Sequence, residues 1–278
     1  MLVRIGSRGS RLALVQAELA AAAIRRPGYD VVIVPMTTAG DRDRTSPFGQ
    51  IGERGVFVKE IEEALLGGRI DVAVHSAKDM TSTDTEGLVV GAYLERDDPR
   101  DALVGASELQ PGMRIGTASV RRRAQLLALE PTISVEPLRG NIDTRLRKLK
   151  ERGLDALVLA SCGLDRLGLE DAIGLRIPPG EMLPEAAQGA VALQVRLGEE
   201  EIVEHAGHAE TRRRVEAERA CVAVVGAGCL APVAAHHDGE LLTALIAAED
   251  GSWLERASGE DPIELAQALV AASARRAA

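Results

Sequence analysis

Residues 4–16, RIGSRGSRLALVQ, have the pattern of a strand that turns directly into a helix. A short apolar run ends at a glycine-containing turn, and Leu12, Val15 and Leu19 then recur at the spacing of one helix face. Ser10 precedes this helical pattern, where its hydroxyl can accept a backbone N–H of the first turn. Because a strand that leads into a helix is the basic unit of α/β folds, this stretch favours that class.

The same alternation of strand and helix continues along the chain. Short apolar runs at 31–34, 71–74 and 156–159 predict buried strands. Between these runs, apolar residues recur at helical spacing. The predicted helix faces consist of Val58, Ile61 and Leu65, and of Ile142, Leu146 and Leu149. This alternation predicts parallel or mostly parallel sheets with helices on both faces.

The C-terminal segment follows a different pattern. Residues 241–246 and 253–257 are typical of two strands, and Glu249-Asp-Gly251 between them predicts a hairpin turn. Asp261 and Pro262 then suit the N-cap and the first turn of a final helix. We therefore expect a small α+β module at this end of the chain.

The composition limits the classes of ligand. The chain has 278 residues, and 46% of them are hydrophobic, so it can form more than one sizeable core. Aromatic residues make up only 2%, which leaves few platforms on which bases could stack. The formal net charge of −9 also argues against a nucleic-acid partner.

The sequence has the marks of a cytoplasmic protein rather than an exported or membrane-embedded one. The longest apolar runs are far too short to span a bilayer. Arginines stand near the N-terminus, where a signal peptide has its apolar core. Cys162, Cys221 and Cys229 form no CxxC pair, which is typical of free thiols in a reducing compartment.

Three predicted helix starts, at 6–10, 116–123 and 138–145, share a glycine, a Ser or Asn cap and at least one arginine. The N-terminus of a helix attracts anions, and a guanidinium group matches a carboxylate or phosphate. Each start alone also fits a plain cap beside a solvated arginine. Together, in an acidic chain, they favour a cleft for a ligand with several negative charges, at the carboxyl ends of the strands.

Residues 71–80, DVAVHSAKDM, place polar side chains directly after a buried strand. Lys78 next to Asp79 would keep that carboxylate ionised, ready to stabilise a cation or to move a proton. The alternative is structural, with Ser76 and Asp79 closing a turn and His75 hydrogen-bonded in the core. The spacing alone leaves both interpretations open.

Residues 226–233, GAGCLAPV, put Cys229 in a glycine-rich loop that is followed closely by a proline. Cys162 and Cys221 lie in or beside apolar runs and fit packing better. The pair His236-His237 has no third ligand at a recognisable spacing, so we predict no metal site. The chain contains no Walker loop, no GxSxG motif and no Rossmann fingerprint.

Taken together, a series of segments resembles the hydroxymethylbilane synthase family, also called porphobilinogen deaminases. In chain order they are RIGSRGSRLALVQ, GVFVKEIEEALL, DVAVHSAKDM, ERDDPRDA, GTASVRRRAQL, LRGNIDTRL, LPEAAQGAV and GAGCLAPV. They occur in the order of the family and extend over nearly the whole chain, so a chance match is implausible.

The resemblance implies an α/β fold with two lobes similar to two-domain anion-binding proteins, and a small C-terminal α+β domain. It places domain 1 at 1–94 and 190–207, domain 2 at 95–189 and domain 3 at 208–278. It also implies a monomer with a dipyrromethane cofactor, which the loop cysteine holds through a thioether.

The resemblance further implies a transferase of porphyrin and heme biosynthesis. Such an enzyme condenses four porphobilinogen molecules into the linear tetrapyrrole hydroxymethylbilane, with release of ammonia, on the dipyrromethane primer. Asp79 matches the catalytic aspartate of the family. The positions that match cofactor contacts are Cys229, Ser76, Lys78, Asp79, Ser119, Arg121 and Arg122. The positions that match contacts to substrate carboxylates are Arg8, Ser10, Gln16, Arg139, Arg145 and Gln188.

The chain departs from the family pattern at a few positions. Gln50 and Arg54 stand in a polar segment, 42–55, that we interpret as a lid, where relatives can have lysines. Ala118 replaces a common hydroxyl residue. The alternative function is a non-catalytic two-lobed anion- or solute-binding protein, but that function leaves Cys229 and the small third domain unexplained.

Overall fold

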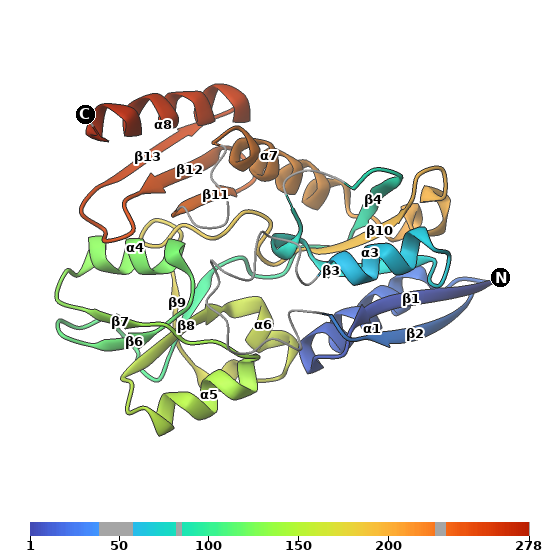
Figure 1. Ribbon diagram of the computed structural model, residues 1–278, viewed down its shortest axis with the longest axis horizontal. Helices are drawn as coiled ribbons and strands as arrows, with labels where there is room; N and C mark the ends of the chain where they lie inside the picture. The colour runs from blue at the N-terminus through green and yellow to red at the C-terminus, as the bar shows by residue number, and fades with distance from the viewer. Residues whose placement is uncertain (39–57, 82–84, 226–231, 278) are drawn as a thin grey trace. The chain divides into compact units, whose positions relative to one another are not determined.

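The computed structural model (Figure 1) describes four stretches of the chain, residues 1–38, 58–81, 85–225 and 232–277. Several predictions fall on positions outside these described residues. They concern the lid at 42–55, with Gln50 and Arg54, and the loop that carries Cys229.

The chain divides into two compact units, each formed by two separate stretches of sequence. Unit 1 comprises Met1–Asp97 and Gly189–Arg213, and unit 2 comprises Asp98–Gln188 and Arg214–Ala278. The predicted division into three domains stays a prediction.

Unit 1 is built on a five-stranded sheet with the strand order β2-β1-β3-β10-β4. β1 pairs in parallel with β2 and β3, whereas β10 runs antiparallel to both β3 and β4. One strand of this sheet is therefore reversed, and the sheet is mostly parallel as predicted. The elements of unit 1 are β1 (Leu2–Arg8), α1 (Arg11–Ile24), β2 (Asp30–Met36), α3 (Lys59–Leu66), β3 (Val72–Ser76), the 3-10 helix η1 (Ala77–Asp79), β4 (Leu88–Tyr93), β10 (Val191–Arg196) and the 3-10 helices η3 (Glu200–Ile202) and η4 (Glu204–Ala206).

Helices cover both faces of this sheet, as the alternation along β3 shows. Val72 and Val74 belong to the apolar cluster that includes α1, while Ala73 packs with Ile61 and Leu65 of α3 on the other face. The predicted face of α3 is therefore correct. Side chains alternate across a strand, so one short apolar run supplies both cores.

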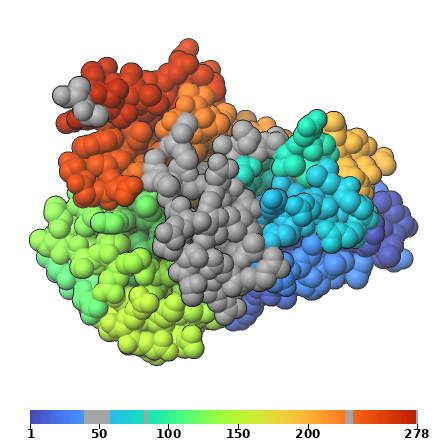
Figure 2. Space-filling view, in the orientation of Figure 1, coloured from blue at the N-terminus to red at the C-terminus, as the bar shows by residue number. Residues whose placement is uncertain are grey.

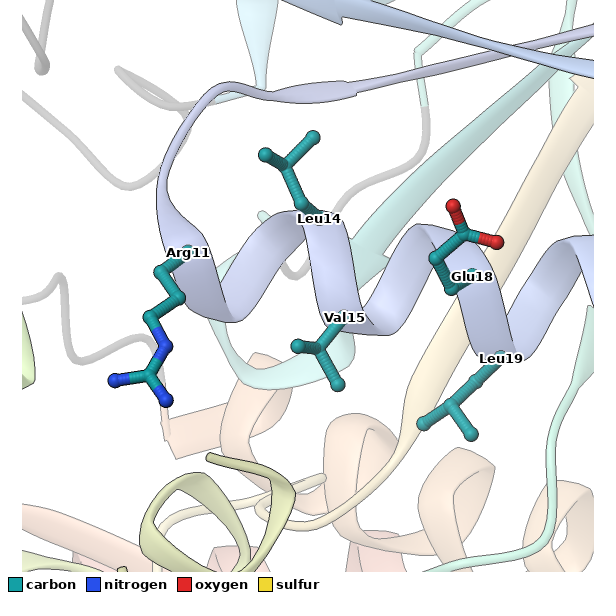
Figure 3. A pocket seen from close by; sticks show the side chains of 5 residues that line it. All are labelled: Arg11, Leu14, Val15, Glu18 and Leu19. Carbon is teal, nitrogen blue, oxygen red and sulfur yellow. The ribbon is translucent and has the colours of Figure 1, made fainter. Parts of the chain in front are cut away.

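α1 packs on the sheet through small side chains. Its buried positions are Ala13, Gln16, Ala17, Ala20, Ala21 and Ile24. The predicted face of Leu12, Val15 and Leu19 is wrong, since Leu19 is 43% exposed. Figure 3 shows Val15 and Leu19 pointing to the same side of α1. A surface pocket of about 410 Å³ is lined there by Arg11, Leu14, Val15, Glu18 and Leu19. Alanines let the helix lie close to the strands, so the bulkier residues occupy the outer side.

Unit 2 repeats this topology with the strand order β7-β6-β8-β5-β9. β6 pairs in parallel with β7 and β8, and β5 runs antiparallel to β8 and β9. The elements of this sheet and its helices are β5 (Asp101–Val104), β6 (Arg114–Gly116), α4 (Val120–Leu129), β7 (Ser134–Glu136), α5 (Ile142–Glu151), β8 (Ala156–Ala160), α6 (Ser161–Arg166), the 3-10 helix η2 (Glu170–Ala172) and β9 (Ile173–Ile177).

The strand β8 again supplies two cores. Val158 packs with Leu126 of α4 on one face, and Leu157 packs with Leu164 of α6 on the other. The predicted face of α5 also packs against this second core. Ser119 caps α4, as predicted, but the side chain of Asn141 makes no cap hydrogen bond to α5. Asn141, which is exposed, therefore occupies the predicted N-cap position of α5 without the side-chain hydrogen bond.

The C-terminal module forms an antiparallel sheet with the order β11-β12-β13. Its elements are α7 (Ala209–Val225), β11 (Val233–His237), β12 (Leu242–Ala247), β13 (Leu254–Gly259) and α8 (Pro262–Ala277). The predicted hairpin and final helix are confirmed, and Asp261 Oδ1 accepts the backbone N–H groups of Ile263 and Glu264. α8, red in Figure 2, lies at the surface. Within unit 2, Leu245 of this sheet packs with Ala124 of α4.

No helix in the described part of the chain is long and apolar enough to cross a membrane. Among the same residues, no group of three or more His, Cys, Asp or Glu side chains could hold a metal ion.

Candidate active site

The carboxyl ends of β1 and β3 form one edge of the unit 1 sheet, because these strands are parallel neighbours. Arg8 ends β1 and Ser76 ends β3. Gln16 reaches this edge from α1, where its Nε2 donates to Ser76 Oγ at 2.9 Å. Ser10 caps α1 by accepting the N–H of Ala13 at 3.3 Å. The structure thus brings together Gln16 and Ser76, two of the predicted site residues.

Lys78 and Asp79 follow Ser76 on the short helix η1 and are both half-buried. The helix is anchored where the N–H of Ala77 donates to the carbonyl of Ala190 at 3.0 Å. A carboxylate and an ammonium group are therefore carried on a fixed backbone at the sheet edge, where solvent and ligand have access.

A hydrogen-bonded chain that begins at the buried pair His75 and Gln194 lies behind this edge. His75 Nε2 is 3.1 Å from Gln194 Oε1, and Gln194 Nε2 donates to Glu62 Oε1 at 2.8 Å. Thr85 Oγ1 donates to the other oxygen of Glu62, also at 2.8 Å. Burial lowers the pKa of His75 to about 4, more than the nearby Glu62 and the Gln194 hydrogen bond raise it. The structural interpretation of His75 is therefore correct, and its imidazole is neutral at pH 7.

In unit 2, Arg121 and Arg122 begin α4 and are buried rather than solvated. Asp101, the first residue of β5, is fully buried between them. Its Oδ2 accepts Nη1 of Arg121 at 2.8 Å, and its Oδ1 accepts Nε and Nη2 of Arg122 at 3.1 and 2.8 Å. Burial raises the pKa of Asp101, but the two guanidinium groups more than offset this and hold it well below its usual range.

Gln188 completes this buried cluster. Its Nε2 donates to Asp101 Oδ1 and to the carbonyl of Pro99, both at 2.8 Å. Two nitrogens of Arg121, Nε and Nη2, have no hydrogen-bond partner among the described residues, although Arg121 is only 3% exposed. An unpaired buried guanidinium edge is unfavourable unless an acceptor binds there.

Arg139 and Arg145 lie after β7, whose carboxyl end neighbours that of β6 because the two strands are parallel. Both arginines are half-buried. Arg145 Nε donates to the carbonyl of Gly140 at 2.7 Å, which fixes its side chain across the start of α5. These two arginines are more accessible than the buried pair on α4.

Sequence reasoning missed two buried carboxylates in unit 2. Asp101 belongs to the quoted segment ERDDPRDA. The sequence feature that could have indicated it is a carboxylate directly before an apolar run. Glu218 of α7 is fully buried and accepts the N–H groups of Ala187 at 2.7 Å and His237 at 2.8 Å. Ala187 has a positive φ of 62°, which is uncommon for alanine, so this contact supports a strained backbone.

The described cysteines are packing residues, as expected. Cys162 and Cys221 are both buried. Burial raises the pKa of the Cys221 thiol to about 11, so it is not a nucleophile at neutral pH.

The model of one protein family, described as porphobilinogen deaminase, dipyromethane cofactor binding domain, matches residues 3–204. A porphobilinogen deaminase of Roseiflexus sp. is 43% identical over 95% of this chain and 93% of the relative. The porphobilinogen deaminase of Chromobacterium violaceum is 43% identical over 98% of this chain and 93% of its own length.

Solved structures with a similar fold include the second substrate-binding domain of GlnP from Lactococcus lactis. That similarity has 14% identity and a TM-score of 0.45, and it extends over 74% of this chain and 86% of that one. The relatives named above match along nearly their whole length at more than 40% identity. The chain therefore belongs to the porphobilinogen deaminase family.

Proposed function

We propose that this protein condenses four porphobilinogen molecules into the linear tetrapyrrole hydroxymethylbilane, with release of ammonia. The observation that supports this most directly is the match to porphobilinogen deaminases over nearly the whole chain. The two sheet edges add physical support, since one carries a carboxylate and the other a buried guanidinium pair. A solute-binding protein without chemistry is the weaker function, because these relatives are named as deaminases along their full length.

A dipyrromethane cofactor suits the residues of unit 2. The open Nε and Nη2 edge of Arg121 fits an acidic side chain such as those that pyrroles of this pathway carry. Cys229 would hold the cofactor through a thioether, and Ser119 and Arg122 of unit 2 would add polar contacts. When bound, the group supplies the pyrrole ring from which the chain is extended.

Asp79 would be the catalytic residue. Porphobilinogen becomes a cation when it loses ammonia. After a pyrrole carbon of the growing chain attacks this cation, that carbon loses its proton and the ring becomes aromatic again. A carboxylate at the ring nitrogens stabilises the developing positive charge and can accept or relay the proton. Asp79 is half-buried on an anchored helix, so its charge is available to a ligand at the edge of the sheet.

The other assigned residues would hold the carboxylates of a chain whose negative charge grows with each addition. Guanidinium groups suit this task because their forks bind carboxylates in fixed geometry. Ser10, Gln16 and Gln188 are placed here as positioning or hydrogen-bonding groups. The arginines assigned to substrate carboxylates are Arg8, Arg139 and Arg145.

The same proposal includes the division into domains, the oligomeric state and the location in the cell. Domain 1 would comprise 1–94 and 190–207, domain 2 residues 95–189 and domain 3 residues 208–278. The protein would act as a monomer in the cytoplasm, with no nucleic-acid or membrane partner.

Denatured intact mass tests the function directly. Protein made in cells that supply the pathway is expected to exceed its sequence mass by a two-pyrrole adduct. Cys229→Ser should lose the adduct, whereas Cys162→Ser and Cys221→Ser should keep it as matched controls. A wild-type mass equal to that of the bare chain would reject the proposed function.

A further inference from the structure

We propose that Asp101 is a positioning residue for ligand binding: it fixes Arg121 and Arg122 so that the Nε and Nη2 fork of Arg121 faces an acidic group of the bound pyrrole chain. This inference rests on the proposed function, and it assigns a role to a residue that does not itself touch the ligand.

The geometry of Arg121 supports this role. Its Nη1 donates to Asp101 Oδ2 at 2.8 Å and to the carbonyl of Leu183 at 2.7 Å. Because the guanidinium group is planar, two acceptors on Nη1 set the direction of the whole plane. The opposite edge, Nε with Nη2, then remains without a partner among the described residues.

Elsewhere in the protein the same two nitrogens bind a carboxylate as a fork. Arg4 donates from Nε and Nη2 to the two oxygens of Asp71 at 2.9 and 2.7 Å. Arg100 does the same to Asp98, with Nε and Nη2 contacts at 2.9 and 2.8 Å. The Nε and Nη2 edge of Arg121 therefore presents the same two donors that bind a carboxylate in Arg4 and Arg100.

Arg122 differs from Arg121 in that its nitrogens are engaged. Nε and Nη2 donate to Asp101, and Nη1 donates to the carbonyl of Val158 at 3.1 Å. Asp101 thus accepts hydrogen bonds from Nε and Nη2 of Arg122, and it orients the guanidinium group of Arg121. The contribution of Arg122 is to neutralise and hold Asp101.

The charges of the cluster lead to the same conclusion. Asp101, Arg121 and Arg122 are 0, 3 and 5% exposed, and they carry one negative and two positive charges. A buried excess positive charge is costly unless an anion binds. A carboxylate on the Arg121 fork would balance the cluster, whereas loss of Asp101 would leave two unpaired guanidinium groups.

The test compares Asp101→Asn with Asp98→Asn in the full-length protein. Asp98 is a matched control, because it also accepts hydrogen bonds from two arginines, Arg100 and Arg176, in the same unit. Each variant is examined for its melting temperature, its two-pyrrole adduct by denatured intact mass, and its KM and kcat for porphobilinogen.

Both substitutions are expected to lower the melting temperature. Only Asp101→Asn should reduce the fraction of folded molecules with the adduct, and only it should raise KM, by about tenfold to a hundredfold for one lost charge-assisted contact. Adduct and KM at wild-type values in folded Asp101→Asn would overturn the inference, and so would equal changes in Asp98→Asn.

If Asp101→Asn does not fold, the variant Gln188→Met tests the positioning role of Asp101 instead. This change keeps the carboxylate and both arginines but removes the amide that holds Asp101 Oδ1. A reduced fraction of folded molecules with the adduct supports the positioning role, and a wild-type fraction rejects it. Absence of the adduct from the wild-type protein would instead reject the proposed function, so the two failures are distinguishable.

Discussion

The two five-stranded sheets share one topology, with the fourth strand of each reversed, but their polar edges are held in different ways. In unit 1 uncharged side chains meet at the edge, Gln16 with Ser76 and His75 with Gln194, and Gln194 in turn donates to the half-buried Glu62 carboxylate. In unit 2 the edge is held by ions, with Asp101 buried between two guanidinium groups.

The difference determines what each edge can do. The half-buried carboxylate of Asp79, carried on an anchored helix at the edge of unit 1, suits proton transfer and stabilisation of a cation. A buried ion cluster is rigid and carries excess positive charge, which suits a permanently held anion. The same sheet topology thus supports a reactive edge in one unit and a binding edge in the other.

The largest effect is expected at the reactive edge. Asp79→Asn keeps the size of the side chain but removes its charge, so turnover should fall by about 10²–10⁴-fold, the range for losing a general acid–base or electrostatic group. The melting temperature should change little, because Asp79 is half-buried and outside the apolar core.

Asp30→Asn is the matched control, since Asp30 lies exposed at the start of β2 in the same sheet. It should keep wild-type turnover. Near-wild-type activity in a folded Asp79→Asn protein would remove Asp79 from the mechanism and break the contrast between the two edges.

The second effect concerns the order in which arginines are needed. Arg121→Gln and Arg122→Gln should act earliest, on the primer or first substrate, because these groups are buried and fixed. Arg8→Gln, Arg139→Gln and Arg145→Gln should stall elongation at different chain lengths. Each lost contact should cost about 1.5–3 kcal/mol, the range for charge-assisted hydrogen bonds.

Mass spectra of stalled intermediates measure this order. Arg123→Gln is the control, because Arg123 is the exposed neighbour of the buried pair on α4. If all five variants slowed turnover equally, with an unchanged pattern of intermediates, staged binding would be wrong.

The third effect is a pH dependence that originates in unit 1. His75 has a pKa of about 4 in the folded protein against an ordinary 6.5, so the unfolded chain binds more protons between these values. Lowering the pH through this window therefore reduces the free energy of unfolding, by about 2 kcal/mol between pH 7 and 4.5. Asp101 stays ionised over the same range because its pKa is depressed.

Urea unfolding at both pH values measures this loss. In His75→Gln the amide can still bond to Gln194, and the dependence on pH should be smaller by that amount. His205→Gln, a histidine of the same unit hydrogen-bonded to the Ile24 carbonyl, should retain the wild-type dependence. An unchanged dependence in His75→Gln would show that His75 is not its source.

The sequence predicted features that depend on neighbouring residues. The Ser10 and Ser119 caps, the β12–β13 hairpin and the strand before Asp79 each involve a few consecutive positions. The face of α1 was predicted wrongly because leucine and valine outweigh alanine in any hydrophobic pattern, although close packing on a sheet favours the smaller side chain.

The hydrogen bonds that hold the two sheet edges could not be predicted, because the residues that form them are far apart in sequence. Gln194 and Glu62 are separated by 132 positions, and Gln188 and Asp101 by 87. A pattern along one chain does not indicate which distant residues will meet. Arg121 and Arg122 were recognised as part of a helix start and, through the resemblance, as cofactor contacts, but nothing in the sequence paired them with Asp101.

The smallest effect is expected at an exposed ion pair of unit 2, which shows how little a charge contributes when it is neither buried nor placed at the site. Arg147 and Glu151 on α5 form an exposed pair at 3.5 Å, with side chains 66 and 55% exposed. Water screens such a pair, so Arg147→Ala should reduce the free energy of unfolding by only about 0.3–0.5 kcal/mol. Urea unfolding should detect this small change, and turnover should stay at the wild-type level. Arg145→Ala, two residues earlier on the same helix, should instead impair elongation with a similarly small change in stability. If Arg147→Ala impaired elongation as much as Arg145→Ala, the positive charge of α5 as a whole would attract the ligand, and individually placed guanidinium groups would not be required.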